Sequence, residues 1–362
     1  MALNIQIATD MTAFQLEEFI SPKSAADILQ HVANKPLLEV LEKNKEEFGA
    51  AGPAAGTSTP PNVREAVQGK LMKDNPSNYI GISGNDTLQF GQSQGAIFTT
   101  APVRMMHTGF EILHDELMQQ GIVITKDNNA TSTKEEKFAL LDLLKTRKAD
   151  YLESLLFCRN QTLWANGLQD AKAIAGIKSI ITDDPTVGTR LGIDAGANTW
   201  WRHIARTGVG GALPMLVYSK DNQSMTETIL RDILELTKYG GRPTVWMAGA
   251  DAYDMATKEA RAKGTLTMTG LTEGNTQVQV QGVAFARDMI LRHDPTLDMI
   301  GESKRIYAWD PRHLRLRPQK KEWGRVINQN QPYDQLVMLI STIDRGTLSC
   351  NQMDCNYVAQ VQ

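Results

Sequence analysis

Apolar residues at helical spacing predict one long helix, two shorter amphipathic ones and two N-terminal helices, one after Ser21-Pro22 and a short one at Leu37, Leu38 and Leu41. Ser132 and Thr133 each stand three residues before a glutamate, which is the capping-box pattern, and leucines then recur along one side of the segment. A helix from Lys134 to Ala165 would be about 48 Å long, which few compact enzymes contain. The two shorter amphipathic segments are Ser224–Lys238 and Ala250–Ala262.

Strand patterns occupy most of the second half of the chain. Runs of alternating or continuous apolar residues predict strands at Thr244–Met247, Thr276–Ile290, Arg305–Trp309, Leu314–Pro318 and Leu336–Ile343. A short strand followed by a long irregular segment is expected over Gly176–Ala205. Because helices and strands do not alternate regularly, the order predicts a mixed α+β fold and not a repeated βαβ unit.

A polar, strand-like segment extends from Val63 to about Met106. Its turn residues and β-favouring runs predict a long hairpin, but it has too few apolar residues to form a core. Such a hairpin is only marginally stable unless it lies on another surface. The preceding segment, Ala50–Pro61, is rich in Gly, Pro, Ser and Thr and predicts a linker. The hairpin therefore indicates assembly with a partner.

Composition describes a globular chain that can bury a large core. The 362 residues are 41% hydrophobic and 22% charged, with a formal charge of −3, which excludes a disordered tail, a collagen and a small disulfide scaffold. No apolar run approaches the roughly 20 residues of a membrane-spanning helix, and the N-terminus lacks a secretion signal, so a cytosolic, membrane-free location is expected. The odd trio of cysteines, Cys158, Cys350 and Cys355, predicts neither a disulfide framework nor a zinc site.

Two short motifs match functional patterns but lack the context that those patterns need. Gly91–Gly95 fits G-x-S-x-G with Ser93 at the nucleophile position, yet the residues before it are polar and those after it are strand-like. A hairpin turn is therefore favoured over a hydrolase serine. The glycine-rich segment Thr207–Leu213 lacks the Gly-Lys-Ser/Thr ending of a phosphate loop and predicts a flexible loop.

The titratable residues form no catalytic or metal-binding pattern. His107 and His114 are seven residues apart, which on a helix places them two turns apart on one face, too far to share an ion without other ligands. Asp183 and Asp184 are adjacent, so on an extended chain they point to opposite sides, and a turn is favoured over an acid/base pair. No catalytic residue, cofactor or metal ligand is predicted.

The segment from Glu302 to Arg325 is basic in a chain that is nearly neutral overall. Within it, Arg315 and Arg317 alternate with leucines and therefore share one face of a strand. Three interpretations stay open: a surface facing phosphate groups, a strip of salt bridges between subunits, and an ordinary solvated strand. The candidate residues for the lumen or for contacts between subunits are Arg312, Arg315, Arg317, Lys320 and Lys321.

Three segments share a pattern with one known family. They are GIKSIITDDPTVGTRLGID followed by NTWWR (Gly176–Arg202), PTVWMAGADAYDM (Pro243–Met255) and VQVQGVAFARDMI (Val278–Ile290). Together with the order of elements over most of the chain, they resemble the major capsid proteins of tailed double-stranded DNA bacteriophages, of the Hong Kong 97 type.

The resemblance implies an α+β capsid fold of this type with six parts. These are an N-terminal arm (1–61), an extended loop (62–106), a peripheral domain (107–204) with a spine helix (132–168), an axial domain (205–302), peripheral-domain strands (303–350) and a C-terminal return to the axial domain (351–362). The resemblance also implies that the extended loop lies on a neighbouring subunit and that the arm can swing as a shell expands.

The same resemblance implies a structural protein without enzymatic activity or cofactor. Its partners would be copies of itself, as hexamers and pentamers of an icosahedral virion capsid, and packaged double-stranded DNA through non-specific contacts. Scaffold and portal proteins, and in some cases decoration proteins, would assist assembly in the host bacterial cytoplasm. The alternatives are an encapsulin-like compartment that holds cargo enzymes, a different virion protein, and a soluble cytosolic enzyme, for which the sequence offers no catalytic group.

Overall fold

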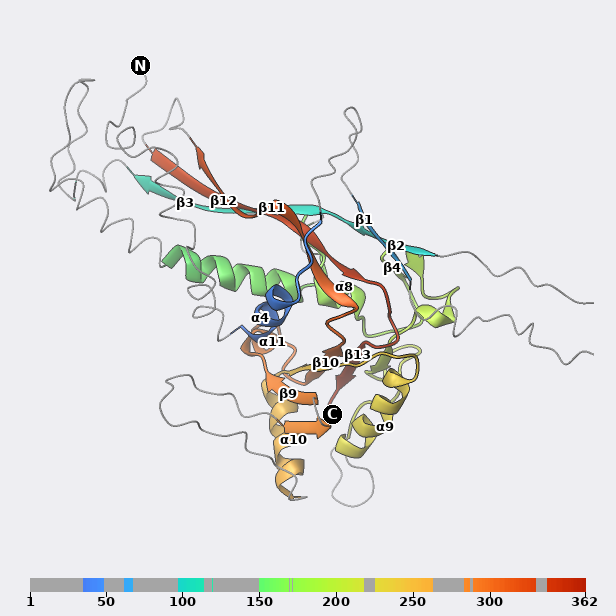
Figure 1. Ribbon diagram of the computed structural model, residues 1–362. Coiled ribbons are helices and arrows are strands. Elements are labelled where there is room, and N and C mark those ends of the chain that lie inside the picture. Colours follow the sequence, from blue (N-terminus) through green and yellow to red (C-terminus); the bar gives the residue numbers. More distant parts are fainter. Residues whose placement is uncertain are drawn as a thin grey trace, which may run out of the picture.

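The structure is a computed structural model with a sheet-and-helix unit at each end (Figure 1). It describes residues 35–48, 62–67, 97–113, 119, 150–168, 170, 172–217, 225–262, 283–286, 289–329 and 337–362. One end holds a six-stranded sheet with two helices, and the other holds a long three-stranded sheet with a long helix beside it. In the described part of the chain, no helix is both long and apolar enough to cross a membrane.

The six-stranded sheet mixes parallel and antiparallel pairs. Its order is β6 (Ile204–Arg206), β13 (Tyr357–Gln360), β10 (Arg305–Trp309), β7 (Val245–Ala248), β9 (Met289–His293) and β8 (Val283–Ala286). The pairs β6–β13 and β7–β9 are parallel, and the other neighbours are antiparallel. The predicted strands at Thr244–Met247 and Arg305–Trp309 are confirmed. Of the strand predicted at Thr276–Ile290, residues 276–282 lie outside the described residues, and the rest falls in β8 and the start of β9.

The strands β7, β10 and β13 in this sheet are buried on both faces, which explains why they are almost continuously apolar. Successive residues of β10 alternate between two cores: Tyr307 and Trp309 face one, and Ile306 and Ala308 face the other. The second core is closed by α9 (Met225–Thr237) and α10 (Ala250–Ala262) (Figure 1).

Helices α9 and α10 confirm the two shorter amphipathic predictions, and buried polar contacts fix their positions. Glu259 of α10 accepts hydrogen bonds from the backbone N–H groups of Met225 and Thr226, at 2.9 and 3.0 Å, and so caps the start of α9. Asp232 of α9 forms a two-pronged ion pair with Arg206 of β6 and lies with it below one-tenth exposure. The helix is therefore tied to both its neighbouring helix and the sheet.

The three-stranded sheet is antiparallel throughout. Its order is β11 (Leu314–Gln329), β12 (Val337–Cys350) and β3 (Arg104–Leu113). The first two strands are longer than predicted, and β11 is interrupted by a bulge at residues 319–322 between its pairs Pro318↔Gly346 and Trp323↔Asp344. The edge of β11 that faces away from β12 pairs with the segment after α4 (Pro36–Lys43). There the N–H of Phe48 donates to the Pro318 carbonyl at 3.1 Å.

The described part of the long helix covers residues 150–164 and lies against this sheet. Near its start, the ring of Tyr151 lies 5.0 Å from that of Phe110 on β3, centroid to centroid. At its end, Trp164 is fully buried against Tyr307 and Trp309 of the other sheet. The earlier part of the predicted helix, from residue 132 to 149, lies outside the described residues. The helix ends at residue 164, one residue before the end predicted from its apolar spacing at Ala165 and four before the 168 that the resemblance implies.

The segment after the long helix corrects one prediction. The short strand expected at the start of Gly176–Ala205 is instead a helical turn, α8 (Ile177–Ile180). Ile177 and Ile180 are both buried, and their spacing of three suits a helix better than a strand. The segment continues through the elements β4 (Thr189–Arg190), β5 (Ile193–Asp194) and the 3₁₀ turn Thr199–Trp201.

The glycine-rich loop at 207–213 is held in place, where a flexible loop was predicted. The Asp184 carboxylate accepts hydrogen bonds from the Thr186 N–H and hydroxyl and from the Gly211 N–H, at 2.9, 2.6 and 3.3 Å. These bonds confirm the turn predicted at Asp183 and Asp184. The loop can approach so closely because Gly210 has no side chain: a Cβ there would lie 1.7 Å from an Asp184 carboxylate oxygen.

Two glycine substitutions distinguish the energetic cost of this close contact from the cost of a positive φ. Both Gly188 and Gly210 have positive φ, at 97° and 56°, but a Cβ at Gly188 would meet nothing within 4 Å. We expect Gly188→Ala to cost about 1 to 2 kcal/mol of unfolding free energy, the cost of a left-handed residue with a side chain. Gly210→Ala should cost about 1 to 3 kcal/mol more, from overpacking. Urea denaturation measures both, and equal losses would contradict the contact with Asp184.

Candidate assembly surfaces and domain junction

The base of the predicted hairpin is a short antiparallel ladder. Strand β1 (Asn62–Ala66) pairs with β2 (Phe98–Pro102), and the Val67 N–H adds a bond to the Ile97 carbonyl at 2.9 Å. Figure 1 shows this ladder at one end of the three-stranded sheet. Residues 68–96 lie outside the described residues. The ladder stops at Pro102 because the chain then joins the three-stranded sheet as β3, four residues before the boundary predicted at Met106.

Arg317 binds this base to the sheet, and Arg315 pairs with the segment that follows α4. Glu65 of β1 accepts a hydrogen bond from the Arg317 Nε at 2.6 Å and another from the Ser349 hydroxyl at 2.9 Å. Glu46 forms ion pairs with both Arg315 and Arg317. Their common partner confirms that the two arginines share one strand face, and these salt bridges lie within one subunit. Arg317 is mostly buried, with 15% of its side chain exposed.

The remaining basic candidates are exposed at two separate places. Lys320 and Lys321 lie in the bulge of β11, where Lys321 adopts a positive φ of 65°. Arg312 lies at the junction between the two sheets, where its guanidinium pairs with Asp310. The structure therefore does not bring the five predicted residues into one site.

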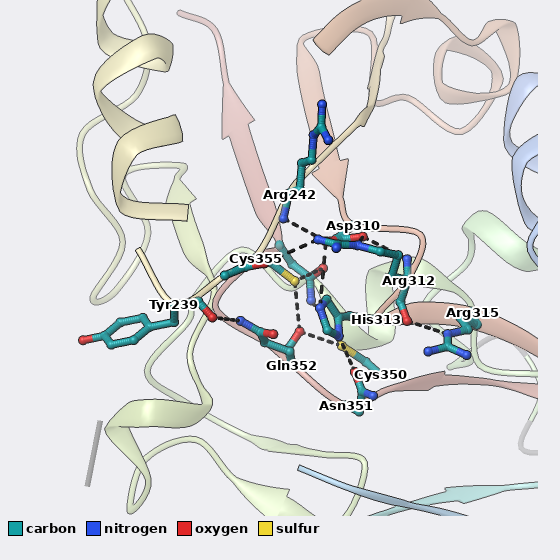
Figure 2. Close-up of polar contacts among 12 residues, drawn as sticks. Tyr239, Arg242, Asp310, Arg312, His313, Arg315, Cys350, Asn351, Gln352 and Cys355 are labelled. Carbon is teal, nitrogen blue, oxygen red and sulfur yellow. Dashed lines mark hydrogen bonds and ion pairs between the residues drawn. The ribbon is translucent and has the colours of Figure 1, made fainter. Parts of the chain in front are cut away.

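Two connectors join the sheets, and they lie side by side (Figure 2). Residues 310–313 lead from β10 to β11, and residues 351–356 lead from β12 back to β13. The Asn351 N–H donates to the His313 carbonyl at 3.3 Å, and the two side chains are in hydrogen-bond contact at 2.7 Å. Gln352 donates to the Tyr239 carbonyl at 3.3 Å, just beyond α9. We call residues 239–242, 310–313 and 350–356 the domain junction.

Asp310 is the central charge of the domain junction. Its carboxylate is 1% exposed and accepts hydrogen bonds from the Arg242 N–H at 2.8 Å, the Arg312 N–H at 2.9 Å and the Arg312 guanidinium at 2.6 Å. Burial alone would raise the pKa of Asp310, but these hydrogen bonds outweigh it and leave the pKa below its ordinary value. The ionised form thus holds the connector 310–313 to the segment that follows α9, at Arg242.

Neutralising this carboxylate should weaken the domain junction in a pH-dependent way. Because the pKa of Asp310 is lower in the folded state, its ionisation stabilises the fold above the ordinary pKa of about 3.9, and this contribution disappears as the pH falls below that value. We expect Asp310→Asn to cost about 1 to 3 kcal/mol at neutral pH, because buried donors lose a charged acceptor.

Thermal unfolding between about pH 5 and pH 3 checks the sign of this effect. The midpoint of Asp310→Asn should fall less over this range than the wild-type midpoint. Asp254→Asn, an exposed carboxylate on α10, serves as the matched control and should follow the wild type. Parallel curves for Asp310→Asn and the wild type would contradict the assigned role.

The remaining catalytic and metal-binding candidates from the sequence do not come together in the structure. Ser93 and His114 lie outside the described residues. His107 is exposed on β3 opposite Ile343, which agrees with the favoured interpretation of a solvated residue on a helix or strand, and the helix is the alternative that is wrong. It lines a small, mostly apolar groove of about 50 Å³ between β3 and the long helix, together with Leu155 and the exposed Cys158. Among the described residues, no group of three or more His, Cys, Asp or Glu side chains is placed to hold a metal ion.

Sequence reasoning missed the domain junction and the ion pairs of the hairpin base. One feature of the sequence could have pointed to Asp310. It directly follows an apolar strand, and a charged side chain at such a position must be paired or exposed. Glu65 and Arg317 are 252 residues apart, and no local pattern connects them.

Comparison with known proteins identifies the fold. No protein-family model matches the chain, and no curated protein matches its sequence. Among solved structures, the capsid asymmetric unit of cyanophage A-1(L) is similar with a TM-score of 0.56 and 13% identity, covering 90% of this chain and 92% of that one. The chain therefore has a phage capsid fold, and the Hong Kong 97-type α+β fold predicted from the sequence is confirmed.

Two further structures are similar at lower scores. The holo-SrpI encapsulin complex of Synechococcus elongatus has a TM-score of 0.46 and 11% identity, over 90% of this chain and 86% of that one. A virus-like particle from Pyrococcus furiosus has a TM-score of 0.46 and 9% identity, over 96% of this chain and all of that one.

Proposed function

We propose that the chain is the major capsid subunit of a tailed bacteriophage, a structural protein that assembles into an icosahedral shell around double-stranded DNA. The observation that carries the proposal is the capsid fold, which extends over 90% of the chain. The described site chemistry agrees with a structural role, since ion pairs such as Arg206–Asp232 and Asp310–Arg312 hold elements of the fold together.

In this proposal, residues 62–102 form the loop that reaches a neighbouring subunit. The ladder β1–β2 is anchored to the subunit by Glu65, while Phe98 at the start of β2 is 55% exposed. An anchored base with an exposed aromatic side chain suits contact with a second copy. Because loop and receiving surface differ, the contact is heterologous and generates rings, here hexamers and pentamers. Many individually weak contacts then stabilise the closed shell.

The remaining parts follow the predicted layout. Residues 1–61 are the N-terminal arm, the three-stranded sheet and the long helix form the peripheral domain, and the six-stranded sheet with α9 and α10 forms the axial domain. The basic residues that contact DNA phosphates in the lumen, without sequence specificity, are the exposed Arg312, Lys320 and Lys321. Scaffold and portal proteins act as partners during assembly in the bacterial cytoplasm.

Sedimentation velocity of the purified chain over a range of concentrations and salts, with negative-stain images of any fast fraction, tests the proposal. Closed particles, tubes or capsomer rings are the expected result, with the neighbouring genes co-expressed if the chain alone stays small. A monomer or small oligomer under every condition, partners included, would overturn it.

The content of the particles separates the two kinds of shell. A capsid that packages DNA should protect double-stranded DNA from added nuclease when particles are isolated from cells that carry the packaging genes. Particles that instead retain a defined enzyme and no nuclease-resistant DNA would assign the chain to a cargo compartment.

A further inference from the structure

Two buried thiols share one hydrogen-bond acceptor in the domain junction (Figure 2). The Sγ atoms of Cys350 and Cys355 lie 3.1 and 3.3 Å from the same carbonyl oxygen, that of Gln352. The two sulfurs are therefore close neighbours, separated by no more than the sum of these distances. The Asn356 side chain contacts both sulfurs, with its Nδ2 3.4 Å from the Cys350 sulfur and its Oδ1 4.0 Å from the Cys355 sulfur.

The thiol pair lies in the connector that leads from one sheet to the other. Cys350 is the last residue of β12, and Cys355 ends the turn that leads into β13, so the pair spans the connector between the two sheets. The connector is tightly enclosed: a Cβ on Gly241 would lie 2.4 Å from the Cβ of Cys355. Burial raises the pKa of Cys350 to about 12 and raises that of Cys355 well above its ordinary value. Both thiols are therefore protonated and slow to react while the junction is closed.

We propose that Cys350 and Cys355 form a dithiol that closes to an intramolecular disulfide when the protein meets a small-molecule disulfide, and that this bond fixes the connector between the two sheets. One cysteine attacks the reagent disulfide, which gives a mixed disulfide and releases one reagent thiol. The other cysteine then attacks the bound cysteine sulfur and releases the second reagent thiol. The cysteine sulfurs are oxidised, the reagent is reduced, and the two cysteine protons end on the released thiols.

The geometry favours this ring closure over two separate adducts. A disulfide has a sulfur separation of about 2 Å, and both sulfurs already contact one carbonyl oxygen, so ring closure requires only a local rearrangement of the two side chains. The close approach of Gly241 to Cys355 leaves little room beside this residue, so a mixed disulfide formed there is crowded and the second thiol displaces it before a second adduct forms. The condition under which the bond would form in nature rests on the proposed function, because a shell released from the cell moves from a reducing cytosol to oxidising surroundings. The pairing itself is independent of assembly.

The test uses the full chain carrying Cys158→Ser, because exposed Cys158 would otherwise react first. The reduced protein is incubated with 2-hydroxyethyl disulfide under native conditions, and its intact mass is measured after quenching in acid. We expect a loss of about 2 Da with no adduct, and a peptide map that joins Cys350 to Cys355. The matched variants Cys158→Ser/Cys350→Ser and Cys158→Ser/Cys355→Ser should show no such loss. The oxidised protein should also have a higher thermal midpoint than the reduced one.

Each other outcome would overturn the proposal. Two reagent adducts, or a Cys350–Cys355 bond that forms only in urea, would show that the native fold does not pair the thiols. An unchanged mass under native conditions would show the same, provided that the denatured protein reacts fully. A disulfide without any rise in the thermal midpoint would remove the role in fixing the connector. All of these readouts are taken on unassembled protein, so they are distinguishable from a failure to form shells.

Discussion

Deletion of residues 68–96 is expected to abolish closed shells while leaving a folded subunit. The deletion is geometrically mild, because Val67 and Ile97 are already joined by a hydrogen bond of 2.9 Å and a short Gly-Ser turn can connect them. It removes the part of the loop that reaches a neighbour in the proposed assembly. Removing the whole segment 62–106 would be a worse test, since β3 begins at Arg104 and belongs to the three-stranded sheet.

Sedimentation velocity and negative-stain images measure this outcome. A variant in which 68–96 is replaced by a Gly/Ser segment of equal length is the matched control for chain length, and it should also fail to assemble because it lacks the contacting side chains. Circular dichroism and thermal unfolding should match the wild type in both variants. Shells at the wild-type yield from either variant would contradict the role given to the loop.

Trp164→Ala should produce the largest loss of stability. The indole is 0% exposed and packs between the end of the long helix and β10, with its ring centroid 5.2 Å from that of Tyr307. Its Nε1–H donates to the buried Asp294 carboxylate at 2.8 Å. Removing a buried tryptophan costs about 3 to 5 kcal/mol, and the carboxylate then loses a donor as well. Much of the stability of a typical domain would be lost.

Denaturation in urea measures this loss, with two controls. Leu168→Ala, at 85% exposure four residues later, should change the unfolding free energy by less than about 0.5 kcal/mol. Trp164→Phe keeps an aromatic ring but removes the N–H, so its cost should fall between the two. A loss below about 1 kcal/mol for Trp164→Ala would contradict the packing at the junction between helix and sheets.

Elements with strong local signals were predicted well. The bounds of α10 and β10 agree with the sequence prediction, and α9 differs by one residue at each end. In the helices, one face is apolar and the other polar, so the helical period is visible in the residues themselves. Strand β10 is apolar throughout because both of its faces are buried, which also leaves a local pattern.

Elements that depend on distant contacts were predicted poorly. Ile177–Ile180 favours a strand by composition, yet it forms a helical turn because both isoleucines point into one core. The bulge in β11 depends on its pairing with β12 and on the segment at Phe48. Propensity describes a residue and its neighbours, whereas these outcomes depend on partners far along the chain.

By itself, the sequence determined the class of fold, the amphipathic helices, the buried strands and the two paired strands at the base of the predicted hairpin. Only the tertiary structure decided that Arg315 and Arg317 are paired within the subunit, that Asp310 accepts a hydrogen bond from Arg242, and that Cys350 and Cys355 share an acceptor. Periodicity is a local property that a single segment carries. Ion pairs and thiol proximity arise when segments far apart in sequence fold together, and no segment contains that information alone.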